Sequence, residues 1–119
     1  MPDAFDTLAT KYAAFVEKRD WEQFHTPQNL AMALSVEANE LLEEFLWFNN
    51  PAAEMVATDD ELMDNVREEL ADVIIYAIGL ATVLEIDLMD AVEAKMEQNE
   101  ARFDEETAAT IAAELEEWQ

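Results

Sequence analysis

Glycine is nearly absent from this chain: Gly79 is the only glycine among 119 residues, and there are only three prolines. A β-rich protein of this length needs many turns, and turns draw heavily on glycine and proline. Alanine, leucine and glutamate, which favour helices, are abundant instead. The sequence therefore predicts an all-α fold in a single domain, residues 1–119, with a modest core of the kind that oligomerisation often completes.

Helix boundaries follow from apolar spacing and from capping residues. The predicted helices cover residues 3–19, 27–48, 59–84, 88–103 and 104–119. Thr26 before Pro27 is a start signal, because a threonine hydroxyl caps a helix and proline suits its first position. Asp87 can cap the fourth helix in the same way. We expect a four-helix core over residues 3–103, a short C-terminal helix, and an oligomeric helical bundle.

The chain carries 29 acidic and 6 basic residues, a formal net charge of −23. This charge argues against nucleic acids and anionic membranes as partners, because both are themselves negative. The acids are spread over the predicted helix surfaces rather than gathered in a tail. We interpret them as the solvated coat of a halophilic protein, since concentrated salt screens the self-repulsion. An ordinary acidic mesophilic protein is the alternative.

The sequence shows no sign of export or membrane insertion. It has no cysteine, and so no disulfide or thiolate zinc site. Residues 1–12 lack the apolar core of a signal peptide, and the most apolar run, residues 73–84, is too short to span a bilayer. We therefore expect a cytoplasmic protein.

Two pairs of carboxylates are candidate metal ligands: Glu37 with Glu40, and Glu69 with Asp72. The members of each pair are three residues apart, which places them on one face of a helix. Carboxylate oxygens suit a hard cation such as Mg²⁺, with Mn²⁺ as a substitute. In a chain this acidic many such pairs arise by chance, so the spacing alone decides nothing.

The surroundings of Asp72 are more informative. It is the only charged residue between Ala71 and Leu84. A helix that is apolar all round is expected to be buried, and burying an ionised aspartate alone is costly. Asp72 must then pair with a basic residue or bind a metal, and the scarcity of basic residues favours the metal. If the second and third helices pack antiparallel, the four carboxylates form a cluster that requires cations.

The fourth predicted helix carries a stripe of donors. Lys95, Asn99 and Arg102 follow one another at helical spacing, and such donors suit phosphate oxygens. The alternative is that Lys95 extends from the apolar face and pairs with a nearby acid.

Aromatic side chains offer surfaces for a nucleobase. Trp21 and Trp47 lie near predicted helix ends, and Tyr76 lies one turn after Asp72. Aromatic faces stack on bases, although most tryptophans are core or interface residues. His25 is the only histidine; a single histidine makes no metal site, and we interpret it as structural or as a contact to the substrate's edge.

Taken together, four segments resemble the dCTP pyrophosphatase branch of the MazG-type all-α NTP pyrophosphatases. They read RDWEQFHTPQNL, ALSVEANELLEEFLW, EELADVIIYAIGLA and DLMDAVEAKMEQNEARF. The resemblance covers roughly residues 10–103, and the blocks that flank the carboxylates make it specific.

The resemblance implies a role for each candidate. Four positions match the magnesium ligands of the family, and they also carry the catalytic carboxylates: Glu37, Glu40, Glu69 and Asp72. The positions matching aromatics that enclose the base are Trp21 and Trp47. The positions matching residues that hold the sugar and phosphates are Tyr76, Lys95, Asn99 and Arg102. Tyr12 stands where relatives carry a histidine near the base, which leaves the base preference open.

The resemblance also implies a function. We expect a magnesium-dependent pyrophosphohydrolase that converts a (d)NTP and water to the (d)NMP and pyrophosphate. Its substrate would be dCTP or a modified or non-canonical pyrimidine deoxynucleotide, and its role would be nucleotide-pool sanitation. It would assemble as a homotetramer built from dimers, with sites shared between subunits. The alternatives are a non-catalytic acidic module that binds nucleotides or divalent ions, and a DNA mimic, which only the net charge supports.

Overall fold

The computed structural model describes residues 3–118, and over this range the regular structure is entirely helical. The elements in chain order are α1 (Ala4–Lys18), the short 3₁₀ helix η1 (Glu22–Phe24), α2 (Pro27–Glu43), α3 (Ala53–Ala57), α4 (Asp60–Val83), α5 (Leu88–Arg102) and α6 (Glu105–Glu117). The predicted all-α fold is confirmed. The chain divides into two compact units, Met1–Ile86 and Asp87–Gln119; its organisation as one domain stays a prediction.

Side-chain caps set the starts of the long helices. The Thr26 hydroxyl accepts a hydrogen bond from the backbone N–H of Asn29 at 3.2 Å, and Pro27 occupies the first turn of α2, as expected. The carboxylate of Asp87 caps α5 in the same manner. These acceptors satisfy backbone donors that have no partner within the first helical turn. The starts were therefore predictable from local sequence.

The end of α2 differs from the prediction, because the helix stops at Glu43 rather than at Phe48. Beyond Glu43 the backbone closes successive three-residue turns, such as Phe48 N–H to the carbonyl of Phe45 at 3.0 Å. Asn50 then adopts a positive φ of 48° before Pro51. The connection that follows contains α3, and the segment before α2 contains η1; neither short helix was expected.

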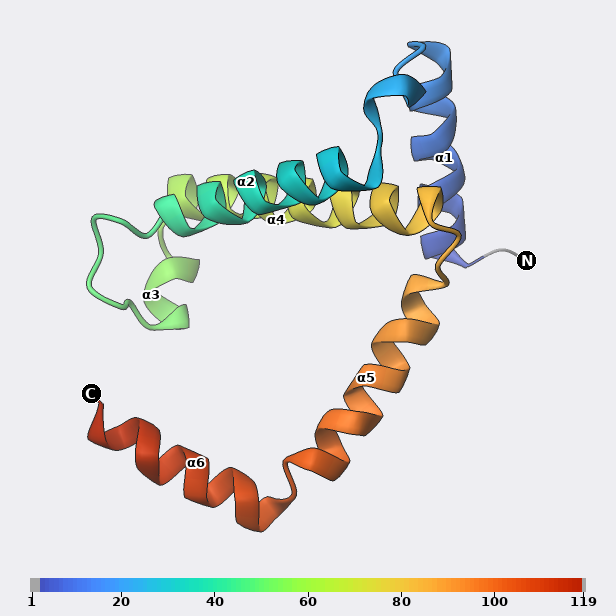
Figure 1. Ribbon diagram of the computed structural model, residues 1–119. Coiled ribbons are helices and arrows are strands. Elements are labelled where there is room, and N and C mark those ends of the chain that lie inside the picture. The colour runs from blue at the N-terminus through green and yellow to red at the C-terminus, as the bar shows by residue number, and fades with distance from the viewer. Residues whose placement is uncertain (1–2, 119) are drawn as a thin grey trace. The chain divides into compact units, whose positions relative to one another are not determined.

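Within the first unit, α2 and α4 lie side by side and run antiparallel, and α1 crosses the C-terminal end of α4 (Figure 1). The buried apolar residues of this unit are Val16, Leu30, Leu62, Ile78 and Ala81. Gly79 lies where α1 crosses, and a Cβ there would be 2.8 Å from Cε1 of Tyr12. The only glycine of the chain thus permits this close crossing.

The expectation that α4 is buried all round is wrong for the single chain. Leu70 and Ile74 are each 49% exposed, and Asp72 is half-buried. The reason is that α2 covers one face of α4 and α1 covers only its C-terminal end, which leaves an apolar face open.

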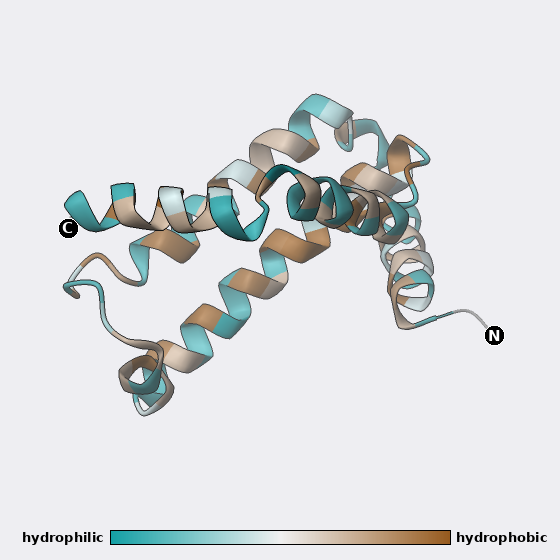
Figure 2. Ribbon diagram, turned by 90° about the horizontal axis from the view of Figure 1, so that it is seen from below, coloured by the Kyte–Doolittle hydropathy of each residue, from teal (hydrophilic) through white to brown (hydrophobic). Residues whose placement is uncertain are grey.

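The second unit contains the two helices α5 and α6. Bands of apolar and polar residues alternate along the helices of the chain (Figure 2). Neither α5 nor α6 has a buried residue, and only Leu88 and Ile111 are half-buried. Among the described residues, no helix combines the length and the apolar character needed to cross a membrane.

Candidate metal centre and adjoining pocket

Three carboxylates meet between α2 and α4. One oxygen each of Glu37, Glu40 and Glu69 lies within 4.8 Å of the others, and all three residues are half-buried. The three-residue spacing puts Glu37 and Glu40 on the same face of α2. The helix α4 packs antiparallel against α2 (Figure 1), and Glu69 on α4 meets both side chains. We call these three residues the carboxylate cluster.

The cluster is electrostatically strained without a cation. A hydrogen bond shared with Glu40, followed by burial and the charge of Glu40, raises the pKa of Glu37 to about 7. Burial is the largest cause that raises the pKa of Glu69, and the charges of Glu40 and Asp72 add to it. Crowded acids hold protons for this reason, because like charges at short range disfavour ionisation. A bound cation would relieve the same repulsion.

Two oxygens of the cluster fit a metal ion for an independent reason. Oε2 of Glu37 and Oε2 of Glu69 are buried and have no hydrogen-bond partner. Buried polar atoms are nearly always satisfied, and leaving one unpaired is unfavourable by about 1–3 kcal/mol. Oxygen donors with this geometry suit Mg²⁺ or Mn²⁺, which prefer hard ligands.

Asp72 lies next to the cluster, one helical turn after Glu69 on α4. Its charge raises the pKa of both Glu37 and Glu69. It is not one of the residues whose oxygens meet within 4.8 Å. Within residues 3–118 the salt bridge lies between Arg67 and Asp64 at 3.0 Å, and none involves Asp72. The salt-bridge alternative for Asp72 therefore finds no support, while its role as a fourth ligand stays a prediction.

A pocket of about 420 Å³ adjoins the cluster. It lies among α1, the η1 segment, α2 and α4, and four residues predicted from the sequence line it: Trp21, His25, Asp72 and Tyr76. Trp21 is 44% exposed, with its ring edge-to-face against Phe15 at 5.8 Å between centroids. The pocket thus joins aromatic surfaces to the side of the carboxylate cluster, an arrangement suited to a planar base carrying a charged group.

The other predicted site residues lie elsewhere. Trp47 is 89% exposed in the turns after α2 and does not line this pocket. Lys95, Asn99 and Arg102 lie on α5, in the second unit, at the helical spacing expected. The guanidinium of Arg102 lies 5.0 Å from the centre of the Phe103 ring. Contact of these four residues with a nucleotide stays a prediction.

The pocket residues that the sequence did not predict include Asn29 and Phe24. The side-chain amide of Asn29 donates to the Phe24 carbonyl at 3.1 Å. A signal was available for Asn29, because Asn29, Ala33 and Glu37 recur every four residues and so share one face of α2. Tyr12 was singled out only as a departure from the family pattern, but it also lines the pocket.

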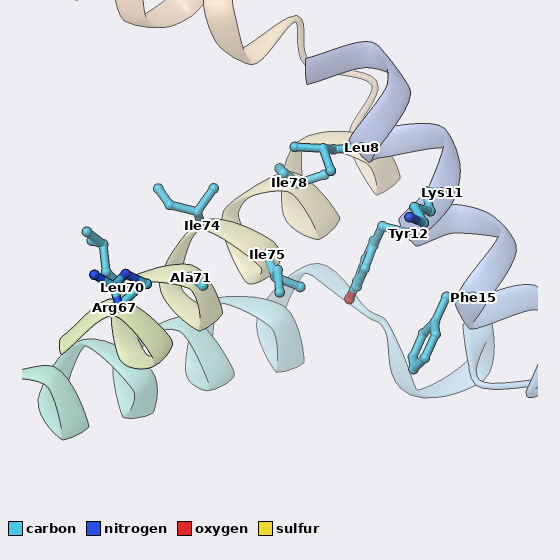
Figure 3. A pocket seen from close by; sticks show the side chains of 10 residues that line it. All are labelled: Leu8, Lys11, Tyr12, Phe15, Arg67, Leu70, Ala71, Ile74, Ile75 and Ile78. Carbon is cyan, nitrogen blue, oxygen red and sulfur yellow. The ribbon is translucent and has the colours of Figure 1, made fainter. Parts of the chain in front are cut away.

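A second, larger cavity of about 750 Å³ is an open apolar groove between α1 and α4 (Figure 3). Leu8, Tyr12 and Phe15 line it from α1, and the α4 side includes Ile74, Ile75 and Ile78. Two basic residues, Lys11 and Arg67, also line it. The groove has the chemistry of a packing surface rather than of a reaction site.

Comparison with known proteins gives consistent matches. A sequence model of the MazG-like family matches residues 32–117. The chain is 41% identical to dCTP pyrophosphatase 1 of Mus musculus over 92 residues, which is 77% of this chain and 54% of that protein. It is 40% identical to dCTP pyrophosphatase 1 of Homo sapiens over the same share of both chains. The chain thus spans about half the length of these curated relatives.

A solved structure is also similar. The crystal structure of a pyrophosphatase from Archaeoglobus fulgidus matches with a TM-score of 0.78 and 36% sequence identity, covering 88% of this chain and 96% of that one.

Proposed function

The chain belongs to the MazG-like family, and we propose that it hydrolyses a nucleoside triphosphate to the monophosphate and pyrophosphate. One observation carries the proposal: unpartnered buried carboxylate oxygens of Glu37 and Glu69 lie beside a pocket lined by aromatic residues. A triphosphate with its base in the pocket would bring its phosphates toward the carboxylates. The names of the relatives, which are pyrophosphatases, support the same activity.

We propose Mg²⁺, with Mn²⁺ as a substitute, as the cofactor held by the carboxylate cluster and Asp72. When bound, the metal would neutralise the triphosphate and make an attacking water more acidic. This neutralisation matters because the net charge of −23 would otherwise repel the substrate.

The chain's own residues supply the remaining chemistry in this proposal. A carboxylate of the cluster accepts a proton from the water while the water oxygen attacks a phosphorus of the α–β linkage. The bond from that phosphorus to the bridging oxygen breaks, and pyrophosphate leaves. Lys95, Asn99 and Arg102 hold the phosphate oxygens through charged and neutral donors, which stabilises the charge that develops during attack.

The pocket would hold the base. Trp21 would offer a stacking face, Tyr76 would contact the nucleotide from the pocket wall, and His25 would contact the edge of the base or orient its neighbours. We propose dCTP or a modified pyrimidine deoxynucleotide as the substrate, and removal of unwanted nucleotides from the cytoplasmic pool as the role. The dCTP named in the relatives supports this choice.

We further propose a homotetramer built from dimers. The apolar groove between α1 and α4 (Figure 3) leaves Leu70 and Ile74 each 49% exposed, a surface that another copy of the chain would cover. Assembly would also allow Trp47, which does not line the pocket of its own chain, to help enclose a base bound to another copy.

The proposal is tested by incubating the purified chain with a panel of nucleoside triphosphates, Mg²⁺ and concentrated salt, and measuring pyrophosphate. We expect release from at least one deoxynucleotide and none after chelation of the metal. Asp72→Asn should abolish turnover without loss of helicity. Asp64→Asn, the same change at an exposed position of α4, is the matched control and should retain activity. Nucleotide binding without any product would overturn the proposal in favour of a non-catalytic binding module.

A further inference from the structure

Within the first unit, the groove between α1 and α4 is open to solvent (Figure 3). Leu8 on its α1 side and Ile74 on its α4 side are both about half exposed. Along α4 the groove extends from Arg67 to Ile78, which is about 17 Å at the rise of a helix. An apolar surface of this length suits a single helix that lies along it with its own apolar face inward.

Helix α6 carries an apolar stripe of matching size. Ile111, Leu115 and Trp118 follow one another at spacings of four and three residues, so their side chains share one face. Leu115 is 59% exposed and Trp118 is 88% exposed, and no residue of α6 is buried. The 13 residues of the helix extend over about 20 Å. The stripe and the groove therefore agree in length and in apolar character.

The charges of the two surfaces are complementary as well. Lys11 and Arg67 are two of only six basic residues in the chain, and both line the groove. Arg67 is paired with Asp64 at 3.0 Å, whereas within residues 3–118 no salt bridge involves Lys11. Lys11 is therefore the cation of the groove that an acidic helix would meet.

Helix α6 is acidic in the position that this contact needs. Its sequence contains five glutamates and no basic residue. Glu114 borders the apolar stripe, because it follows Ile111 by three residues and precedes Trp118 by four. The sequence of α5, in contrast, includes the basic residues Lys95 and Arg102, so charge favours α6 as the helix that covers the groove.

The unit that contains α6 also needs a surface to pack on. The unit Asp87–Gln119 is shorter than the roughly 40 residues below which a chain rarely stabilises a fold alone. Neither α5 nor α6 has a buried residue. An incomplete helical unit and an open groove thus occur in the same chain.

We propose that α6 of a second copy of the chain lies in the groove between α1 and α4. Its apolar stripe packs against Ile74 and the neighbouring apolar residues, and Glu114 of the second copy pairs with Lys11. The contact rests on the proposed assembly of several copies and names the segment that forms it, and it requires neither metal nor nucleotide. If two copies exchange α6 reciprocally, the same contact occurs twice in a symmetric pair.

Cysteine crosslinking tests the contact, and this chain has no cysteine that could interfere. Ile74→Cys marks the groove and Leu115→Cys marks the stripe. The two variants carry different affinity tags and are produced in one cell, so that mixed assemblies form during folding. With a short bis-maleimide we expect a covalent dimer that carries both tags. Met96→Cys, at a 66% exposed position of α5, is the matched control for Leu115→Cys, and its yield with Ile74→Cys should be several-fold lower.

Three results would overturn the inference. A covalent dimer that Ile74→Cys forms alone, as abundantly as the mixed dimer, would mean that two grooves face each other. A stronger crosslink to Met96→Cys would assign the groove to α5. In a chain that carries both Ile74→Cys and Leu115→Cys, a crosslink confined to one chain would mean that the groove holds its own α6. We predict a product of at least two chains instead.

A charge exchange provides a second measurement, which needs no cysteine. At low salt, Lys11→Glu should raise the dissociation constant of the assembly about twofold to fivefold, the effect of an exposed ion pair. Adding Glu114→Lys should restore the original value, because the pair forms again with its charges exchanged. Glu116→Lys makes the same charge change five residues after Ile111, outside the stripe, and should restore less. Equal restoration in sedimentation equilibrium would attribute the effect to net charge and count against the pairing.

Failure of the proposed hydrolysis leaves these measurements unaffected, because both are made without nucleotide. An active chain that forms only groove-to-groove dimers would contradict the α6 contact and not the catalysis. A chain that sediments as a single copy at every concentration would contradict both the contact and the proposed assembly.

Discussion

Gly79 lies directly against the ring of Tyr12, with only 2.8 Å between the Cβ position of residue 79 and Cε1 of the ring. Helix propensity alone favours alanine over glycine within α4 by about 1 kcal/mol. We nevertheless expect Gly79→Ala to lower the free energy of unfolding by about 1–3 kcal/mol, because the ring or the α1 backbone must move. Chemical denaturation measures this change.

The double variant provides the control for this prediction. In a Tyr12→Ala background the steric conflict is gone, so Gly79→Ala should there raise the free energy of unfolding by about 1 kcal/mol. If Gly79→Ala changed the free energy of unfolding in the same direction in the unaltered chain and in the Tyr12→Ala background, the Tyr12 ring would not be the cause of the effect.

The pKa of Glu37 predicts a pH dependence for the metal-free chain. This pKa is about 7 in the folded chain, against an ordinary value of 4.5. Between these values the folded state binds more protons than the unfolded state, so this residue makes stability fall as pH rises. Below about pH 4.5 and above about pH 7 its contribution is flat. Urea denaturation with a chelator at several pH values measures how the free energy of unfolding depends on pH. We expect Glu37→Gln to reduce this pH dependence. Glu43→Gln, at the exposed end of α2, should retain it.

Metal binding should stabilise the fold through the cluster. A cation that binds only the folded chain adds about 2.7 kcal/mol at one hundred times its dissociation constant. We expect Mg²⁺ to raise the melting temperature in concentrated NaCl, where general charge screening is already saturated. Glu69→Gln should abolish the increase, because it removes a ligand. The neighbouring Glu68→Gln, on the exposed side of α4, should preserve it; an equal effect of the two variants would count against the cluster as the binding site.

The apolar groove predicts the outcome of a charge substitution. Ile74 is 49% exposed and lines the groove, so Ile74→Glu should leave the fold of the single chain intact. A buried glutamate at a contact between copies is strongly unfavourable, so the variant should elute as a smaller species in size-exclusion chromatography with light scattering. Thr10→Glu adds the same charge to an exposed site of α1 outside the groove and should keep the original assembly.

The cap of α4 gives a prediction about stability alone. The Asp59 carboxylate accepts a hydrogen bond from the Leu62 N–H at 3.0 Å. Asp59→Ala should lower the free energy of unfolding by about 1 kcal/mol, because it leaves this donor unpaired. Asp60→Ala removes the same charge one residue later and should have a smaller effect. Equal losses would attribute the effect to charge rather than to the cap.

Local signals predicted the helices well, because they act within a few residues. Thr26, Pro27 and Asp87 start their helices where the sequence placed them. The predicted end of α2 was wrong because no strong stop signal precedes Pro51. From Glu44 onward the chain forms turns instead of continuing the helix.

Features that depend on distant segments were harder to predict. Helical spacing placed Glu37 and Glu40 on one face, but their meeting with Glu69 depended on an antiparallel packing that the sequence offered only as a condition. The exposure of Ile74 did not follow from the sequence, since a fully apolar helix does not reveal how much of it one chain covers. The Tyr12–His25 contact joins residues on α1 and beyond η1, and no spacing rule connects them.

Four of the acidic residues differ in kind from the others, because Asp3, Asp59, Asp87 and Asp104 each hold a helix start through a backbone N–H. A carboxylate on the outer face of a helix can be exchanged with little effect on the fold, whereas each of these four also accepts a hydrogen bond from a backbone N–H in the first turn. Replacing acidic residues on the outer helix faces would therefore lower the net charge with little effect on the fold. The same replacement at the four helix starts would also remove a cap and leave a backbone donor unpaired.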